Sequence, residues 1–176
     1  FIIWLIVFNK RKYINVDSFD KENAERILFD IAYELSNNNR LKADFGSLFS
    51  KKRGADDVKQ TKINNFITEN GIRVEAHSTQ ESVRGRIHLN QRPDFLCLDD
   101  FETNKTKDSQ AYTKQIRDHI TEAMAGMSTD ASILYLGNYI TEYGNVQFLL
   151  ERAKSDPKIK VLNVPVLIDG QPSWKS

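Results

Sequence analysis

The sequence has one cysteine, almost no net charge and no apolar run long enough to cross a membrane. With the single Cys97, the 176-residue chain cannot hold an internal disulfide or a cysteine-rich zinc site, and a reducing, intracellular setting is the default. Lysine and arginine number 25 and aspartate and glutamate 24, so the net charge of +1 neither requires nor excludes a nucleic-acid partner. The longest apolar run, residues 1–8, falls short of the roughly 18 residues that span a bilayer. We expect that run to be buried core.

The chain begins with phenylalanine instead of methionine, in the middle of its apolar run. Folded domains seldom begin in this way, and we therefore expect a fragment whose upstream sequence is missing. Apolar residues make up 40% and charged residues 28% of the chain, which is typical of a globular protein. The length suffices for one domain with a sizeable core.

Apolar runs alternate with helical patterns, which predicts an α/β fold with a mostly parallel sheet. The first eight residues fit a helix or a strand equally well. Residues 95–98 and 133–136 are continuously apolar, as expected of strands that are buried on both faces of a parallel sheet. Further strands are expected at residues 13–16, 63–68, 72–76, 86–89 and 159–166, with a hairpin turn at Asn70-Gly71.

Three helices are predicted from apolar residues that recur at helical spacing. The first follows Asp20, a suitable N-cap, and ends at the three asparagines 37–39. A second helix should span Ser109 to about Met127, and a third lies near residues 146–153. The expected inner faces of the first two consist of Ala24, Ile27, Leu28, Ile31, Ala32 and Leu35, and of Tyr112, Ile116, Ile120, Ala123 and Met124. Residues 40–62 read as a charged loop, in which Lys51-Lys52-Arg53 is either solvated or faces DNA.

Acidic residues follow the apolar run at residues 95–98. Asp99 and Asp100 come directly after it, and Glu102 lies two positions further on. Ligands of parallel α/β sheets bind beyond the carboxyl ends of the strands, where carboxylates can hold Mg²⁺ and orient a water for attack on a γ-phosphate. Four apolar residues and two acids are the Walker B arrangement. Alone it is a weak signal, because many buried strands end in an aspartate that caps a helix or forms a turn.

Several motifs around this strand occur in an order that is similar to a known family. The segment Ser78–Arg86, which contains Val83-Arg84-Gly85, precedes Arg92-Pro93-Asp94, the apolar strand and the two aspartates. This stretch resembles the large subunit of tailed-phage terminases. The resemblance extends, in order, to Tyr13–Phe19 followed by Ala24, to Leu41 with Phe45-Gly46, to Ile133–Asn138 as the coupling motif, and to Gly170–Trp174 as a connection towards a second domain.

The resemblance implies a three-layer P-loop NTPase core of the additional-strand class, truncated at its N-terminus. Residues 1–168 would form a partial ATPase domain without its phosphate-loop strand, and residues 169–176 would lead to a C-terminal nuclease domain that is not present. The implied activity is ATP hydrolysis, with ATP and Mg²⁺ as cofactors, in a motor that drives DNA into a prohead in the host cytoplasm. The implied partners are double-stranded DNA, the terminase small subunit, the portal protein and further copies in a ring, with no membrane.

Site residues follow from the same resemblance. Asp99 is assigned to the Mg²⁺ shell and Asp100, as a second metal-site carboxylate, to catalysis. Glu102 is the reserve, because many family members have glutamate where Asp100 stands. Asn138 would bond a water linked to the γ-phosphate. Arg84 is the candidate arginine finger for a neighbouring subunit, with Arg86 second; the alternative is a structural arginine that bonds local carbonyls or a carboxylate such as Asp94.

The chain lacks the pattern G-x-x-x-x-G-K-[ST], whose backbone amides cradle phosphates, so we expect this fragment alone to be inactive. One alternative is a non-catalytic or degenerate prophage scaffold that binds DNA or portal protein. Another is a metal-dependent nuclease, because Pro93-Asp94 is similar to the opening of the PD-(D/E)-x-K pattern. The second half of that pattern is absent, which disfavours the nuclease.

Overall fold

The computed structural model describes residues 1–49, 63–78, 81, 85–102, 108–165, 167–168 and 171–173. Its centre is a five-stranded sheet in the order β2-β3-β1-β4-β5. The strands are β1 (Tyr13–Ser18), β2 (Asn65–Ile67), β3 (Arg73–Ser78), β4 (Phe95–Asp99) and β5 (Ser132–Leu136). Only β2 is antiparallel to its neighbour. The predicted α/β class with a mostly parallel sheet is confirmed, an arrangement compatible with Rossmann-like and P-loop folds.

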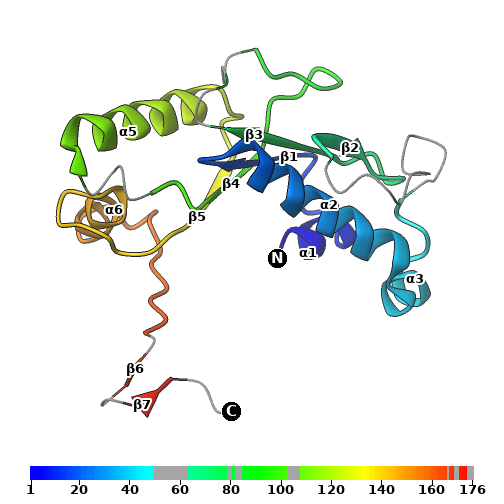
Figure 1. The fold of residues 1–176 in the computed structure, drawn as a ribbon. Helices are drawn as coiled ribbons and strands as arrows, with labels where there is room; N and C mark the ends of the chain where they lie inside the picture. Colours follow the sequence, from blue (N-terminus) through cyan, green and yellow to red (C-terminus); the bar gives the residue numbers. More distant parts are fainter. Residues whose placement is uncertain are drawn as a thin grey trace.

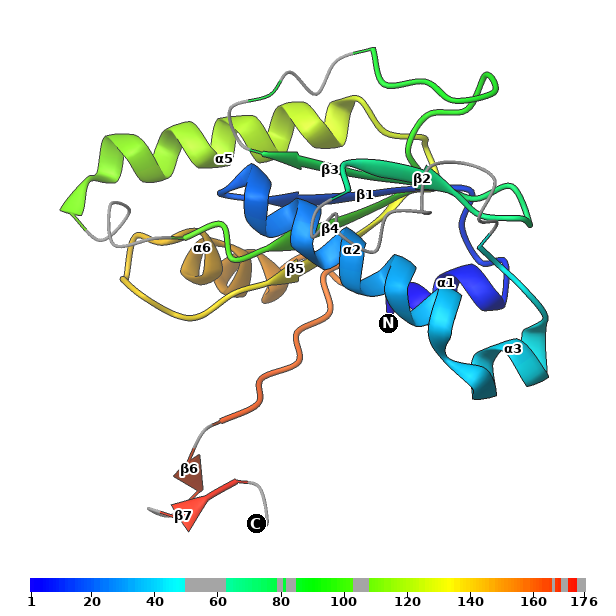
Figure 2. The ribbon, with the colours of Figure 1, turned by 45° about the vertical axis from the view of Figure 1, so that its right-hand side comes forward.

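Helices cover both faces of this sheet (Figures 1 and 2). On one face lie α1 (Ile2–Val7) and α2 (Lys21–Asn37), and on the other lies α5 (Gln110–Ala125). Side chains of β4 alternate between the two cores: Phe95 and Cys97 pack with α1 and α2, whereas Leu96 and Leu98 pack with α5. A strand buried on both faces must be apolar at every position, which is why residues 95–98 form a continuous apolar run.

The ambiguous first segment is a helix. Ile2, Leu5 and Ile6 are the buried residues of α1, and their spacing places them on one helical face. The predicted helix after Asp20 is confirmed as α2, and its buried residues are Ala24, Leu28, Ile31, Ala32 and Leu35. The Asp20 carboxylate accepts a hydrogen bond from the backbone amide of Glu22, so the predicted N-cap is confirmed as well.

We predict that Asp20→Ala lowers the free energy of unfolding by about 1 kcal/mol, because it removes the acceptor that satisfies an amide in the first turn of α2. Urea denaturation of the chain measures this change. The matched control is Asp30→Ala, which removes an exposed carboxylate from the same helix and should change stability by less than about 0.5 kcal/mol. Equal losses in the two variants would contradict the capping role.

Two local predictions in the first half of the chain were wrong. Part of the loop expected at residues 40–62 is helix α3 (Asn39–Phe45), which begins because the side chain of Asn38 accepts from the amides of Arg40 and Leu41. Residues 50–62, with the basic triplet, lie outside the described residues. The strand expected at residues 86–89 is only a bridge between His88 and Gln91, because Leu89 and Asn90 both have positive φ and turn the chain back.

The second predicted helix is confirmed as α5, with Ser109 as its N-cap. Its inner face differs from the expected one, because Thr113, which was not predicted to face inward, is buried. Met124 is 47% exposed, and Met127, just beyond the helix, is buried against β4 instead. The third helix is α6 (Asn145–Ala153), and the hairpin turn at Asn70-Gly71 joins β2 to β3 as predicted.

The sheet ends at β5, and this strand is less buried than its apolar sequence predicts. In the part of the chain that the structure describes, β4 is its only partner, and Ile133 and Leu136 are 38% and 45% exposed. Residues 159–165, the described part of the strand expected at residues 159–166, form no strand. The chain leaves α6 in extended form and runs away from the sheet (Figure 1) to a small pair, β6 (Leu167–Ile168) with β7 (Gln171–Pro172). The predicted domain boundary between residues 168 and 169 therefore falls between two paired strands, β6 and β7.

Among the described residues, no helix is both long and apolar enough to cross a membrane.

Candidate functional site

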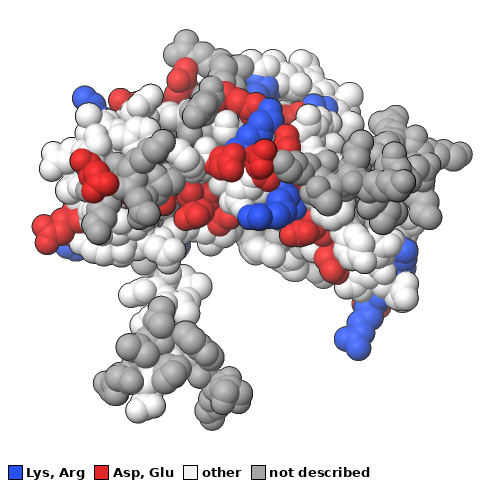
Figure 3. All heavy atoms as spheres, in the orientation of Figure 1, with Lys and Arg blue, Asp and Glu red and all other residues white. Residues whose placement is uncertain are grey.

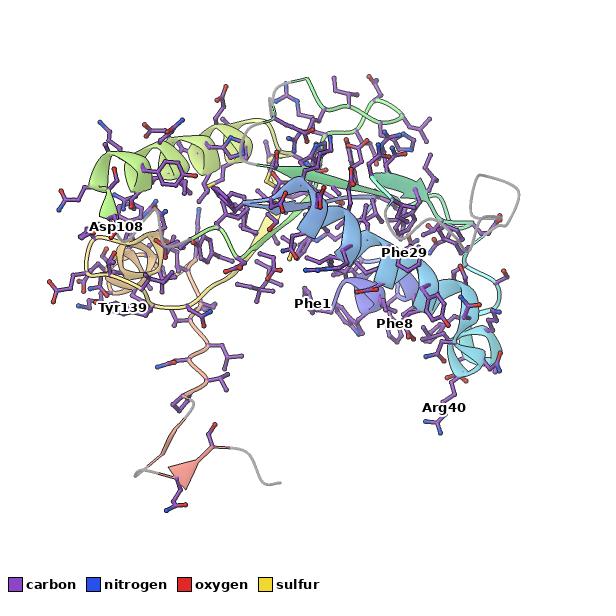
Figure 4. All side chains as sticks on the ribbon, in the orientation of Figure 1. Phe1, Phe8, Phe29, Arg40, Asp108 and Tyr139 are labelled. Atoms are coloured by element: carbon purple, nitrogen blue, oxygen red, sulfur yellow. The ribbon has the colours of Figure 1, made fainter. Side chains whose placement is uncertain are left out.

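Three of the predicted site residues lie at the carboxyl ends of two paired strands. Asp99 is the last residue of β4, and in the parallel register it lies opposite Leu136, the last residue of β5. Asp100 follows β4, and Asn138 lies two residues beyond β5 in an exposed loop. Figure 4 labels Asp108, just before α5, and Tyr139, beside Asn138, at this end of the molecule. The structure thus brings Asp99, Asp100 and Asn138 to the same edge of the sheet.

The chain turns sharply after Asp99. Asp100 has a φ of 51°, in the left-handed region that aspartate tolerates better than most residues. Its backbone amide donates to the carbonyl oxygen of Leu136 at 3.3 Å, which ties the end of β4 to the end of β5. The Asp100 side chain is exposed, so its carboxylate is accessible from solvent beyond the strand ends.

Burial and the neighbouring charge of Asp100 both raise the pKa of the Asp99 carboxyl above its ordinary value. Each effect disfavours a negative charge on Asp99. A cation at this position would act in the opposite direction, because it favours the ionised form. The Asp99 carboxylate, partly buried beside the charge of Asp100, is therefore suited to a positively charged ligand.

Glu102 differs from the two aspartates because it is buried and already bound. Only 5% of the residue is exposed. Its carboxylate accepts from the backbone amides of Asn145 at 2.6 Å and Val146 at 3.3 Å, the first two residues of α6. Free amides at a helix start carry partial positive charge, so a carboxylate there is stabilised. As placed, Glu102 caps α6.

Three buried polar atoms in the segment from β5 to the start of α6 have no hydrogen-bond partner among the described residues. They are the hydroxyl oxygen of Tyr135, the hydroxyl oxygen of Thr141 and the side-chain amide nitrogen of Asn145. Burial, together with the negative charges of Glu102 and Asp100, raises the pKa of the Tyr135 phenol. The Tyr135 hydroxyl is therefore a neutral hydrogen-bond donor near the acidic strand end.

Arg86 contacts a carboxylate that the sequence did not indicate. Its guanidinium lies 3.6 Å from Asp17, with 8% of the Arg86 side chain and none of the Asp17 side chain exposed. Burial raises the pKa of the Asp17 carboxyl, while Arg86 and His77 lower it in part. Both Asp17 oxygens lack a hydrogen bond within the described part of the chain. Asp94, the carboxylate first considered as a partner for the arginines, instead accepts from the amides of Lys12 and Tyr13.

Asp17 belongs to a polar stripe on the sheet face opposite α2. The carboxylate of Glu75 on β3 binds Arg73, the Tyr13 hydroxyl and, at 3.3 Å, the ring of His77. These partners lower the pKa of Glu75 to about 2, against the opposing effect of its burial. Tyr13, Asn15 and Asp17 alternate with apolar residues along β1. This alternation is the sequence pattern that indicates a polar stripe on one face of the strand.

A pocket of about 610 Å³ lies between the 85–92 loop and α5. Of the predicted site residues, only Arg86 lines it. The other charged lining residues are Arg92, Asp118 and Glu122, so the pocket has charges of both signs. Arg84 lies outside the described residues. Within the described ranges, no group of three or more His, Cys, Asp or Glu residues could hold a metal ion.

Basic and acidic side chains are interspersed on the face of the molecule drawn in Figure 3. A surface that binds duplex DNA carries clustered positive charge. This face therefore gives no argument for DNA contact, and the DNA partner stays a prediction.

A comparison of the sequence with protein-family models finds no match, and neither does a comparison with curated proteins. The resemblance to terminase large subunits stays a prediction that depends on the order of the short motifs around β4 and β5.

Proposed function

We propose that this chain is part of an ATP-hydrolysing DNA-packaging motor, a phage terminase large subunit, and carries its Walker B strand end and coupling motif. One observation carries the proposal. Asp99 and Asp100 meet the loop of Asn138 at the carboxyl ends of two paired parallel strands. Ligands of open α/β sheets bind beyond such strand ends.

The side chains at this edge suit a magnesium nucleotide. Mg²⁺ keeps several waters and binds proteins through one or two carboxylates together with substrate phosphates, so the absence of a larger acidic group among the described residues is compatible with it. Bound Mg²⁺ would neutralise charge that develops on the transferred phosphoryl group. In this proposal Asp99 belongs to the coordination shell of Mg²⁺, and Asp100 orients the attacking water. Asn138 forms a hydrogen bond to a water next to the γ-phosphate.

The outer edge of β5 supports the P-loop form of the fold. Strands of a parallel sheet are normally covered on both faces, yet Ile133 and Leu136 are exposed by more than a third. A phosphate-loop strand upstream of Phe1 would pair with β5 and cover these side chains. It would also provide a neighbour for residues 159–164, which have strand-forming composition and no strand partner among the described residues.

In the assembled motor we propose copies of the chain in a ring, with portal protein and small subunit as partners. Arg84 would complete the neighbour's ATP site. Arg86 is the weaker candidate, because its guanidinium is buried against Asp17 in the same chain. A second function, a scaffold that binds DNA or portal protein without hydrolysis, is favoured by one observation: the 176 residues contain no phosphate loop.

The test is to read the coding DNA upstream of Phe1 and to express the complete reading frame. We expect an apolar strand and G-x-x-x-x-G-K-[ST] within roughly 30 residues, a compact strand–loop–helix length, together with Mg²⁺-dependent ATP turnover. A start codon with no phosphate loop, and no binding of ATP, would refute the motor and leave the scaffold as the better function.

A further inference from the structure

Glu102 joins two parts of the molecule that are distant in sequence. It lies two residues after Asp100, and its carboxylate binds the start of α6, 43 residues away from it at Asn145. The loop of residues 137–144, which contains Asn138, ends at this contact. The carboxylate of Glu102 therefore links the acidic end of β4 to the far end of the Asn138 loop.

Gly144 makes this contact possible. A Cβ atom at position 144 would lie 2.8 Å from one Glu102 carboxylate oxygen and 3.3 Å from the other. Real side chains do not approach so closely. The φ of Gly144 is −63°, which any residue adopts. A side chain at position 144 would displace the Glu102 carboxylate, so the close approach of Glu102, and not backbone conformation, favours glycine here.

Arg117 of α5 holds the same helix start from a second direction. Its guanidinium donates to the Asn145 side chain at 3.1 Å and to the backbone carbonyl oxygen of Tyr143 at 3.3 Å. The guanidinium carbon also lies 4.0 Å from the ring centroid of Phe148. The end of the 137–144 loop is thus fixed between a carboxylate from the β4 end and a guanidinium from α5.

We propose that Glu102 is a positioning residue, which holds α6 and the Asn138 loop in register with Asp99 and Asp100, and that it is not the catalytic base. A general base must reach the proton of its water within about 3 Å. Both carboxylate oxygens of Glu102 are instead bound to backbone amides, and the residue is 5% exposed. The reaction that it serves is the proposed ATP hydrolysis, so the kinetic part of the test rests on that function.

The first measurement is independent of any activity. Amide hydrogen exchange of the chain should show Asn145 and Val146 protected in the native protein and exchanging on the order of 10-fold faster in Glu102→Gln, since a loss of about 1.4 kcal/mol is a tenfold change. Gly144→Ala should have the same effect, because the added methyl displaces the carboxylate. The control is Glu151→Gln, which changes an exposed carboxylate of α6 and should leave exchange unaltered. Unprotected amides in the native chain would overturn the inference.

The second measurement uses the complete protein. We expect Glu102→Gln and Gly144→Ala each to lower kcat by on the order of 10²-fold, the cost of a small misplacement of reacting groups. The double variant should lose no more than either single one. The acidic limb of the pH profile of kcat should persist in Glu102→Gln, because in this proposal the Glu102 carboxylate is not the base.

Loss of that acidic limb would make Glu102 the base and overturn the proposal, as would full additivity of the two substitutions. Glu102→Asp should recover little, because the shorter side chain cannot reach both amides. If the native complete protein hydrolyses no ATP, the proposed function fails, and hydrogen exchange alone decides whether Glu102 holds α6.

Discussion

Arg86→Ala lowers the free energy of unfolding by roughly 3–5 kcal/mol at neutral pH, the usual cost of leaving one partner of a buried ion pair without the other. Asp17 is completely buried, and neither of its oxygens has a hydrogen bond among the described residues. Removal of the guanidinium therefore leaves a carboxylate that must stay charged without its partner or take up a proton. Urea denaturation at pH 7 measures the loss.

The pH dependence of this loss has a definite sign. The pKa of Asp17 in the folded protein is already above its ordinary value, because burial outweighs Arg86 and His77. The folded state thus binds the proton more tightly, so the contribution of Asp17 to stability is greatest below the ordinary aspartate pKa of about 3.9 and falls as the pH rises through the raised pKa. Without Arg86 the pKa rises further. We expect Arg86→Ala to lose less stability at low pH than at pH 7.

Asp17→Asn provides the matched comparison. It removes the charge and nearly preserves the shape of the side chain, so the Asp17→Asn, Arg86→Ala double variant should be more stable at pH 7 than Arg86→Ala alone. If Arg86→Ala is as stable as the native protein at all pH values, Arg86 does not compensate Asp17. In that case Arg86 would again be a candidate for the arginine finger.

Asp100→Asn, in the complete protein, should lower kcat for ATP by about 10²–10⁴-fold, the usual contribution of a general base. Asparagine has nearly the same shape but cannot accept the proton of the attacking water. The affinity for ATP should change little, because Asp100 is assigned to the water and not to the nucleotide. Steady-state ATP turnover and equilibrium nucleotide binding separate the two effects.

The control is Asp130→Asn, which alters an exposed aspartate just before β5, at the amino ends of the parallel strands and so away from Asp99 and Asp100. Turnover should be unchanged there. Suppose that Asp100→Asn retains turnover, whereas Glu102→Gln loses both turnover and the acidic limb of the pH profile. Glu102 would then be the general base, and Asp100 would not. Loss of ATP binding in Asp100→Asn would instead show that Asp100 acts mainly as a metal-site carboxylate and not as the base.

Periodicity predicted the elements whose environment is uniform along their length. β4 is buried on both faces along residues 95–98, and this apolar run ends one residue before the strand does. One stripe of α2 faces the core, and the helical spacing of apolar residues predicts all of its buried positions. The position of Asp99 and Asp100 at the carboxyl end of an internal parallel strand followed from the apolar run of β4.

The contacts that define the site are between residues distant in sequence, and no local pattern contains them. Glu102 was recognised as one of three neighbouring acids, but its burial against α6 depends on Gly144, 42 residues further on. Likewise, Asp17 and Arg86 each have an ordinary local context. A sequence pattern can identify an acid near a strand end, whereas only the fold determines whether it faces solvent or a helix start.

The errors at β5 and after α6 have a common cause. Residues 133–136 and 159–164 have the composition of buried parallel strands, but strand formation requires a partner, and composition says nothing of whether one is present. The failed strand at residues 86–89 is different. There a turn at Leu89 and Asn90 interrupts a segment of favourable composition.

Because β5 has a single strand partner among the described residues, we expect the state of this chain in solution to depend on its concentration. Backbone amides and carbonyls along an unpaired strand can bond any other extended backbone, including the same strand of another copy. Such pairing is bimolecular, so its extent rises with protein concentration and is reversed on dilution as long as the sheets have not stacked. Dilute solution, or a charged residue introduced at Ile133 or Leu136, should therefore prevent strands of other copies from pairing with β5.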